Sequence, residues 1–382
     1  MVLVLRPLGR CPTTDLVGFI FLFLLLRAYL LIQVNARKPI FLYNLYIFAG
    51  LSASQLGGFV ARKWTAFDEY SDKIREADAL SFTTAPLTGS WDFAQYLLPR
   101  IILQFGSGAD GTIVHGVTRA NAGFLFMLST QCAERIVFDG RTMKWPEIVM
   151  VPPVTHFAFA CRGPTQWISL SVPTQLGNGG GNGGGNGGFK KHLVALEGGK
   201  TLIAPPADNL MKFIEAATAA RNRLQDARPK QLQAVEASLL GMLDDILWDS
   251  VSERRCFNQR TERVMSKVLE CLQRDNQTHV LALARAAGVS ERTLHRAFKK
   301  YFHIGPKRYS KIRQLNLVRR AIRQGHAAPV NVTGILTEHG VTEFGRFAIE
   351  YKALFHESPA ETLHRHLIAK HDGSGMSYGP TS

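Results

Sequence analysis

Five side chains that donate hydrogen bonds lie close together near the carboxyl end of the chain: Arg292, His295, Arg296, Lys299 and Lys300. The guanidinium group of an arginine can form two hydrogen bonds to O6 and N7 of guanine, and a lysine suits a phosphate. The same residues could instead form a solvated basic face of a helix. The secondary structure predicted around these side chains decides between contact with nucleic acid and a solvated basic face.

The spacing of apolar residues around this cluster predicts a helix-turn-helix unit. Leu283, Ala284 and Ala287 recur at helical spacing, and Gly288 follows where a helix must end in a sharp turn. Ser290 can then cap a second helix. The predicted apolar stripe of this second helix consists of Leu294, Ala297, Phe298 and Tyr301. The donor-rich residues therefore lie on its outward side, as in a helix that enters the major groove.

A second copy of this pattern follows along the chain. Ile335 and Leu336 precede Gly340, which lies 52 residues after Gly288, and Thr342 is the predicted cap of the next helix. The predicted apolar stripe of that helix consists of Phe347, Tyr351, Leu354 and Phe355. Two reading helices on one chain predict recognition of double-stranded DNA.

A basic amphipathic helix is predicted between the two copies. Pro306 stands at a permitted first position, and one side of the helix carries Tyr309, Ile312, Leu315, Val318 and Ile322. The basic residues assigned to its other sides are Lys307, Arg308, Lys311, Arg313, Arg319, Arg320 and Arg323. A helix of about 18 residues spans roughly 27 Å, which could place two reading helices in successive major-groove segments.

Residues 284–306 and 340–359 resemble the DNA-binding domain of the AraC/XylS transcription regulators. The resemblance rests on the two helix-turn-helix copies, their spacing and the Phe-x-x-x-Pro ending after each, and it covers about residues 278–366. It implies that base contacts come from Arg292, His295 and Arg296 in the first reading helix, and from Phe344, Gly345, Arg346 and Ile349 in the second. The sequence departs from the family pattern at His303 and His356, where glycine is usual, and at Val341, where an aromatic residue is usual.

The second set of candidate residues is chemically unlike the first. Phe344, Gly345 and Ile349 carry no side-chain donor, so Arg346 is the only strong donor in the set. The second helix is therefore expected to contact mainly the DNA backbone or thymine methyl groups.

The distribution of charge agrees with a polyanionic partner. Residues 278–370 hold 16 Lys and Arg against 6 Glu and no Asp, so they carry +10 of the net charge of +15 of the chain. Such an asymmetry predicts salt-sensitive binding. Eight of the 12 His residues also lie in this segment, but none has the spacing of zinc ligands.

Residues 68 to about 172 read as short strands separated by turn residues at intervals of about 8 to 12 residues. The predicted strands are 101–105, 123–129, 135–138, 147–151, 156–160 and 167–172. This rhythm predicts a small β-barrel or sandwich, and the segment is similar in position to the cupin-like sensor domain of the AraC/XylS regulators. The candidates for contact with a small effector are Trp91, Phe93, Arg100, Gln104, His115, His156 and Trp167.

An enzymatic function is not expected. A metal-dependent cupin needs clustered His and carboxylate ligands, whereas His115 and His156 stand 41 residues apart without a nearby His-x-His. No nucleophile motif, paired acidic constellation or dinucleotide fingerprint is found, and neither a metal nor a cofactor is expected. The five Cys residues, Cys11, Cys132, Cys161, Cys256 and Cys271, are odd in number and form no Cys-x-x-Cys, which is typical of reduced cytosolic thiols.

The remaining segments are a glycine tract, three helical patterns and an apolar N-terminus. Residues 177–188 contain only Gly and Asn and predict a flexible insertion. Helices are predicted over 209–223, 229–248 and 261–274. The helix over 229–248 has an apolar stripe that includes Leu239 and Leu243. Core packing is the preferred interpretation of this stripe, and a dimer contact is the alternative. Residues 16–32 are apolar apart from Arg27. Three interpretations of this segment are open: a poorly ordered extension, a membrane-associating segment or a buried helix.

Together these observations predict a multidomain α+β protein with a cupin-like β-barrel or sandwich, a helical connector and an all-α domain with two helix-turn-helix motifs. The predicted boundaries are 1–66 for the N-terminal extension, 67–206 for the sensor, 207–275 for the connector, 276–368 for the DNA-binding domain and 369–382 for a disordered tail. The predicted function is an effector-responsive transcription regulator, of the activator type usual in the family, that acts on promoter DNA in the cytoplasm as a homodimer. RNA polymerase is a candidate partner. The alternatives are a membrane-tethered regulator that uses residues 16–32 and a cupin-type enzyme with a basic appendage.

Overall fold

A computed structural model of the chain describes most of the residues after position 61. The described ranges are 62–64, 74, 77–87, 91–108, 111–119, 122–128, 135–173, 199–224, 228–249, 255–256, 259–274, 279–324 and 331–374. The apolar segment 16–32 and the Gly/Asn tract 177–188 lie outside these ranges. No helix among the described residues combines the length and the apolar character that crossing a bilayer requires.

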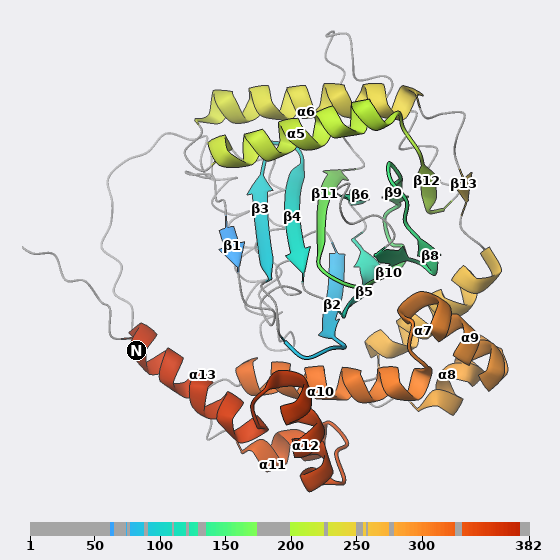
Figure 1. Cartoon of the computed structure of the whole chain (residues 1–382), viewed down its shortest axis with the longest axis vertical. Helices are drawn as coiled ribbons and strands as arrows, with labels where there is room; N and C mark the ends of the chain where they lie inside the picture. Colours follow the sequence, from blue (N-terminus) through green and yellow to red (C-terminus); the bar gives the residue numbers. More distant parts are fainter. Residues whose placement is uncertain are drawn as a thin grey trace, which may run out of the picture. The chain divides into compact units, whose positions relative to one another are not determined.

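Two antiparallel sheets form the N-terminal domain (Figure 1). The larger sheet has the strand order β1-β3-β4-β11-β6-β9-β12-β13, and the smaller has the order β2-β5-β10-β7-β8. The strands of the larger sheet are β1 (Arg62–Trp64), β3 (Asp92–Leu97), β4 (Ile102–Gly108), β6 (Ala122–Leu128), β9 (Ile148–Val151), β11 (Thr165–Pro173), β12 (Thr201–Ile203) and β13 (Arg255–Cys256). Those of the smaller sheet are β2 (Ala77–Thr83), β5 (Thr112–Thr118), β7 (Ile136–Phe138), β8 (Arg141–Thr142) and β10 (His156–Cys161).

An aromatic core fills the space between the sheets. Phe126 of the larger sheet packs against Phe138 and Phe159 of the smaller, with ring centroids 5.5 and 5.1 Å apart. Trp167 lies 5.6 Å from Phe126 on the same sheet. Each fully buried aromatic side chain contributes about 2 to 3 kcal/mol by its burial, so this cluster is a main reason why the two sheets pack face to face. The predicted sandwich is thereby confirmed.

Two helices, α5 (Ala207–Arg223) and α6 (Pro229–Asp249), lie side by side and cover the outer face of the larger sheet (Figure 1). Leu239, Leu243 and Ile246 of α6 are buried there with strand residues such as Leu103 and Leu170. The apolar stripe of α6 therefore packs in the core, which confirms the preferred interpretation of this stripe.

The outer face of the smaller sheet packs against the helices that follow. These are α7 (Gln259–Arg274), α8 (Val280–Ala287), α9 (Glu291–Phe302) and α10 (Pro306–Gln324). Phe82, Ile113 and Ala158 of the sheet share one core with residues of these four helices. A second helical core unites α10 with α11 (Val332–Glu338), α12 (Phe344–Phe355) and α13 (Pro359–Ser374).

Three segments differ from their expected boundaries. β1 pairs with β3 although its residues were assigned to the N-terminal extension. Helix α7 shares the core of α8 and α9, so it packs as part of the first helix-turn-helix unit and not as a separate connector. Helix α13 continues to residue 374, whereas a tail was expected from 369.

Candidate DNA interface

The first helix-turn-helix unit consists of α8, a tight turn and α9. Gly288 ends α8 in the left-handed conformation with φ 67°, which glycine adopts at little cost. Ser290 caps α9, because its hydroxyl accepts a hydrogen bond of 3.3 Å from the backbone N–H of Thr293. Both features confirm the predictions that α8 ends at Gly288 and that Ser290 caps α9.

All five predicted donors on α9 are exposed, namely Arg292, His295, Arg296, Lys299 and Lys300. The opposite face of the helix is buried through Leu294, Ala297, Phe298, Tyr301 and Phe302. The packing therefore leaves guanidinium, imidazole and ammonium groups on one accessible side of the helix.

The second unit consists of α11, a longer turn and α12. Asn331 caps α11 by accepting a hydrogen bond of 3.0 Å from the N–H of Thr333. The prediction that Thr342 caps α12 is wrong: the cap position is Glu343, and it makes no side-chain capping bond. The turn between Gly340 and α12 is one residue longer than the turn between Gly288 and α9, which moves the cap from Thr342 to the next residue.

The side chains predicted for α12 are placed as follows. Phe344, Gly345, Arg346 and Ile349 are exposed. The guanidinium of Arg346 lies 3.2 Å from a carboxylate oxygen of Glu350 and 3.7 Å from one of Glu343. Glu350 is also 2.7 Å from the ammonium of Lys311. Burial favours the neutral form of Glu350, but the hydrogen bonds and charges of Lys311 and Arg346 outweigh it and lower its pKa.

Helix α10 holds the two units together. Tyr309 and Ile312 lie in the core of the first unit, whereas Leu315, Val318 and Ile322 lie in that of the second. At 19 residues the helix is roughly 28 Å long, in agreement with the length predicted for it.

Two arginines of α10 that were assigned to its solvent side are buried instead. Arg313 donates a hydrogen bond to the carbonyl oxygen of Leu272. Arg319 lies 2.5 Å from a carboxylate oxygen of Glu357 and stacks over the ring of Phe355 at 4.6 Å. The side chains of both arginines are buried and paired within the protein, so they cannot contact DNA phosphates. Apolar periodicity cannot reveal a buried ion pair of this kind.

The residues considered for effector binding do not converge on one place. Strand register puts Gln104 and Trp167 on the inner face of the larger sheet, where the Trp167 ring covers Gly106. Gln104 pairs there with Gln95 and Ser169, each at 3.3 Å. Trp91 is also buried and lies against Gly108. The guanidinium of Arg100 is instead 2.6 Å from Glu236 of α6.

His115 and His156 lie on the outer face of the smaller sheet, toward the helical domain. The Nε2 atom of His115 is 2.7 Å from the hydroxyl of Tyr309 in α10. Burial, helped by the charge of Arg313 and by His156, lowers the pKa of His115 to about 3, so this imidazole is neutral. Among the described residues, no group of three His, Cys, Asp or Glu is placed to hold a metal ion.

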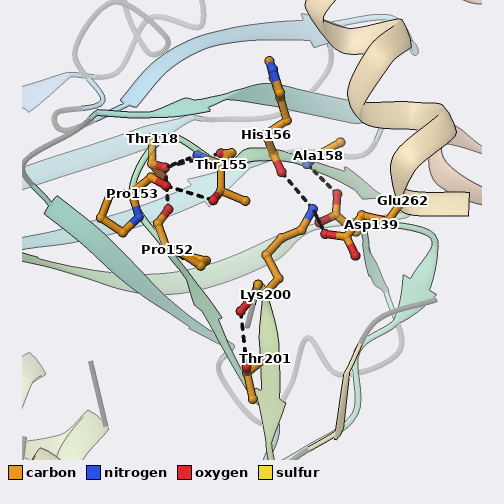
Figure 2. A network of polar contacts seen from close by, with 11 residues as sticks. Thr118, Asp139, Pro152, Pro153, Thr155, His156, Ala158, Lys200, Thr201 and Glu262 are labelled. Atoms are coloured by element: carbon orange, nitrogen blue, oxygen red, sulfur yellow. Dashed lines mark hydrogen bonds and ion pairs between the residues drawn. The ribbon is translucent and has the colours of Figure 1, made fainter. Parts of the chain in front are cut away.

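A buried charge network between the sandwich and α7 was not anticipated (Figure 2). Lys200 pairs with Asp139 of the β7–β8 turn and lies 2.8 Å from Glu262 of α7. Its ammonium group also donates to the carbonyl oxygen of His156 at 2.8 Å. Burial alone would lower the pKa of Lys200, but the two carboxylates outweigh burial and raise it, so the lysine keeps its charge. Nothing in the local sequence around Lys200 signals these distant partners.

Residues 283–365 match the family of helix-turn-helix domains. Over 106 residues the chain is 33% identical to the XylDLEGF operon transcriptional activator of Pseudomonas putida, an alignment that covers 28% of this chain and 32% of that activator. The chain therefore matches about a third of the length of such relatives. It also aligns with the crystal structure of the AraC-like transcriptional activator CuxR over 67% of this chain and 94% of that one, at 11% identity and a TM-score of 0.34. The alignment with ToxT from Vibrio cholerae covers 80% of this chain and 97% of that one, at 8% identity and a TM-score of 0.28.

Proposed function

Because its C-terminal segment is a helix-turn-helix domain of the AraC/XylS family, we propose that the chain is a sequence-specific transcription regulator that reads two successive major-groove segments of promoter DNA. The observation that carries the proposal is the pair of reading helices, each 12 residues long, held by the single helix α10. The outward side of α9 supplies the base contacts through Arg292, His295 and Arg296.

The same helices supply contacts to the DNA backbone. Lys299 and Lys300 extend from the last turn of α9, and Lys352 extends from the last turn of α12. Lysine ammonium groups at these places suit phosphates on either side of a major groove. The second helix adds Phe344, Gly345 and Arg346 to the proposed interface.

The regulatory part of the proposal concerns the β-sandwich. Its inner face is a packed aromatic core with a few buried polar groups, among them Gln95, Gln104 and Ser169. We assign to the sandwich the response to a small effector, and to the whole chain the role of a homodimeric, cytoplasmic activator in contact with RNA polymerase. The named activator from Pseudomonas putida supports activation over repression.

The test is selection of random DNA duplexes by the purified full-length chain, followed by footprinting on the selected site. We expect protection of two major-groove segments about 10 base pairs apart and an affinity that falls steeply with salt. Lys230→Ala, which removes an exposed lysine from α6, is the matched control and should bind as the wild type does. A chain that shows no preference among duplexes at moderate ionic strength contradicts the proposal.

A further inference from the structure

The two reading helices share one register but differ in chemistry. Both contain 12 residues and both are followed by a histidine in the left-handed conformation, His303 at φ 60° and His356 at φ 58°. Counted from the first residue of each helix, Gly345 occupies the position of Arg292. In the same register Ile349 occupies the position of Arg296. The two guanidinium groups that dominate the outward side of α9 therefore have no counterpart in α12.

The outward side of α12 is an apolar surface. The side chain of Ile349 is 74% exposed and that of Phe344 is 40% exposed, although both are large and hydrophobic. A Cβ atom at Gly345 would meet nothing within 4 Å. Because helical side chains lean toward the N-terminus of their helix, Ile349 extends over the open position of Gly345, one turn earlier.

The nearby donor, Arg346, is held alongside its own helix. It corresponds in register to Thr293 of α9, to one side of the line through Gly345 and Ile349. Its contacts with Glu343 and Glu350 keep the guanidinium beside two carboxylates, and Lys311 fixes the second of these. Because the Arg346 side chain is 71% exposed, these surface pairs orient the guanidinium along the helix but contribute little energy.

We propose that α12 recognises thymine through its methyl group, with Ile349 and Phe344 as the contacting side chains, whereas α9 recognises bases by hydrogen bonds. The C5-methyl of thymine is the apolar group that the standard base pairs present in the major groove. Lys352, at the position of Lys299 in α9, is exposed and adjoins this apolar surface, which fits a polyanionic duplex. The inference rests on the proposed function and assigns a base preference to its second half-site.

The experiment compares thymine with deoxyuridine, which lacks only the methyl group. The duplex selected by the full-length chain is resynthesised with deoxyuridine in one half-site at a time. The half-site whose base preference disappears in Arg296→Ala belongs to α9, and the other belongs to α12. We expect deoxyuridine to weaken wild-type binding about three- to fivefold per contacted thymine in the α12 half-site and to have no effect in the α9 half-site.

Variants of α12 connect this effect to the named side chains. Ile349→Ala should reduce the deoxyuridine effect, because Phe344 then remains as the contacting side chain. The double variant Ile349→Ala/Phe344→Ala should bind thymine and deoxyuridine duplexes equally, because the methyl group then has no partner. Leu367→Ala removes an exposed apolar side chain from α13 and should keep the full deoxyuridine effect. Ile349→Arg, which gives α12 the counterpart of Arg296 in α9, should shift the selected base from thymine to guanine.

The outcomes separate this inference from the proposed function. Equal wild-type affinity for thymine and deoxyuridine in the α12 half-site overturns the inference and leaves the proposed function intact. An undiminished deoxyuridine effect in both single variants and in the double variant Ile349→Ala/Phe344→Ala overturns the assignment to these side chains. A chain that selects no duplex overturns both proposals.

Discussion

The histidines that follow the two reading helices adopt a backbone conformation that histidine rarely adopts. His303 and His356 occupy the left-handed conformation at positions where the family pattern has glycine. The side chain of His303 is contacted by Arg162 from the loop after β10. The reading helices therefore end at the same point despite the substitution.

Recognition of bases by α9 should depend on its two outward arginines. Arg292→Ala and Arg296→Ala should each weaken binding to the selected duplex by about 1 to 3 kcal/mol and change binding to random DNA little, because each removes a contact to a base. Lys299→Ala should weaken binding to both duplexes alike. Titration of each variant by fluorescence anisotropy gives both affinities. Equal losses on both duplexes for the arginine variants would contradict direct base recognition.

His115 gives a prediction for pH. Its folded-state pKa of about 3 lies below its ordinary value, so the folded protein binds the proton less well than the unfolded chain. Its contribution to stability is complete above about pH 6.5 and decreases as the pH falls toward 3. When the pH is lowered from 7.5 to 5, the free energy of unfolding should decrease in the wild type because His115 resists protonation. The decrease should be about 2 kcal/mol smaller in His115→Gln.

Urea unfolding at the two pH values measures this difference. His295→Gln is the matched control, since it makes the same substitution at an exposed histidine on α9. If His115→Gln loses as much stability on acidification as the wild type, the neutral buried imidazole is not the cause.

At the scale of elements, the two helix-turn-helix units differ in their caps. Ser290 accepts a hydrogen bond from Thr293, whereas the side chain of Thr342 lies outside the cap position of α12. Ser290→Ala should therefore lower the free energy of unfolding by about 1 kcal/mol, and Thr342→Ala should leave it nearly unchanged. Thermal unfolding of the pair provides the comparison. Equal destabilisation would indicate that Thr342 caps α12 after all.

The elements that could be predicted from the sequence are those with a strong local signal. The reading helices follow from Gly288, Ser290 and the apolar stripe that ends at Tyr301, all within one short segment. β5 was missed because Gly116 and His115 interrupt its apolar run, although burial against α10 makes the strand stable there. Thr342 was misplaced because a turn longer by one residue carries no signature of its own.

At the scale of the molecule, polar contacts join the sandwich to the helices. The side-chain amide of Asn316 in α10 bonds to both backbone groups of Thr83 at 3.1 Å. Gly140, at φ 76°, lies against the ring of Tyr301, where a Cβ atom would come within 2.8 Å. These partners lie more than a hundred residues apart in sequence, so no local pattern could predict them. The face of the sandwich that meets the helical domain could therefore not be predicted from the sequence, nor could the separation of Gln104 from His115.

The buried network around Lys200 gives a prediction at this scale. Lys200→Met should lower the free energy of unfolding by about 3 to 5 kcal/mol, because it leaves the buried carboxylate of Asp139 without its partner. The double variant with Asp139→Asn should regain part of this loss, since the charge that then remains without Lys200, on Glu262, is partly exposed to solvent. Urea denaturation of both variants tests it. A loss below about 1 kcal/mol in Lys200→Met would contradict the assigned role of the pair.

Helix α10 also limits how the two proposed reading helices and their DNA sites can change together. It is one unbroken helix with residues in the cores of both units, so the separation of the reading helices depends on its residue count. Each inserted residue would advance the second unit by about 1.5 Å and rotate it by about 100°. Point substitutions can thus alter which bases are favoured, whereas operators with a new distance between their halves require an insertion or deletion of nearly whole helical turns.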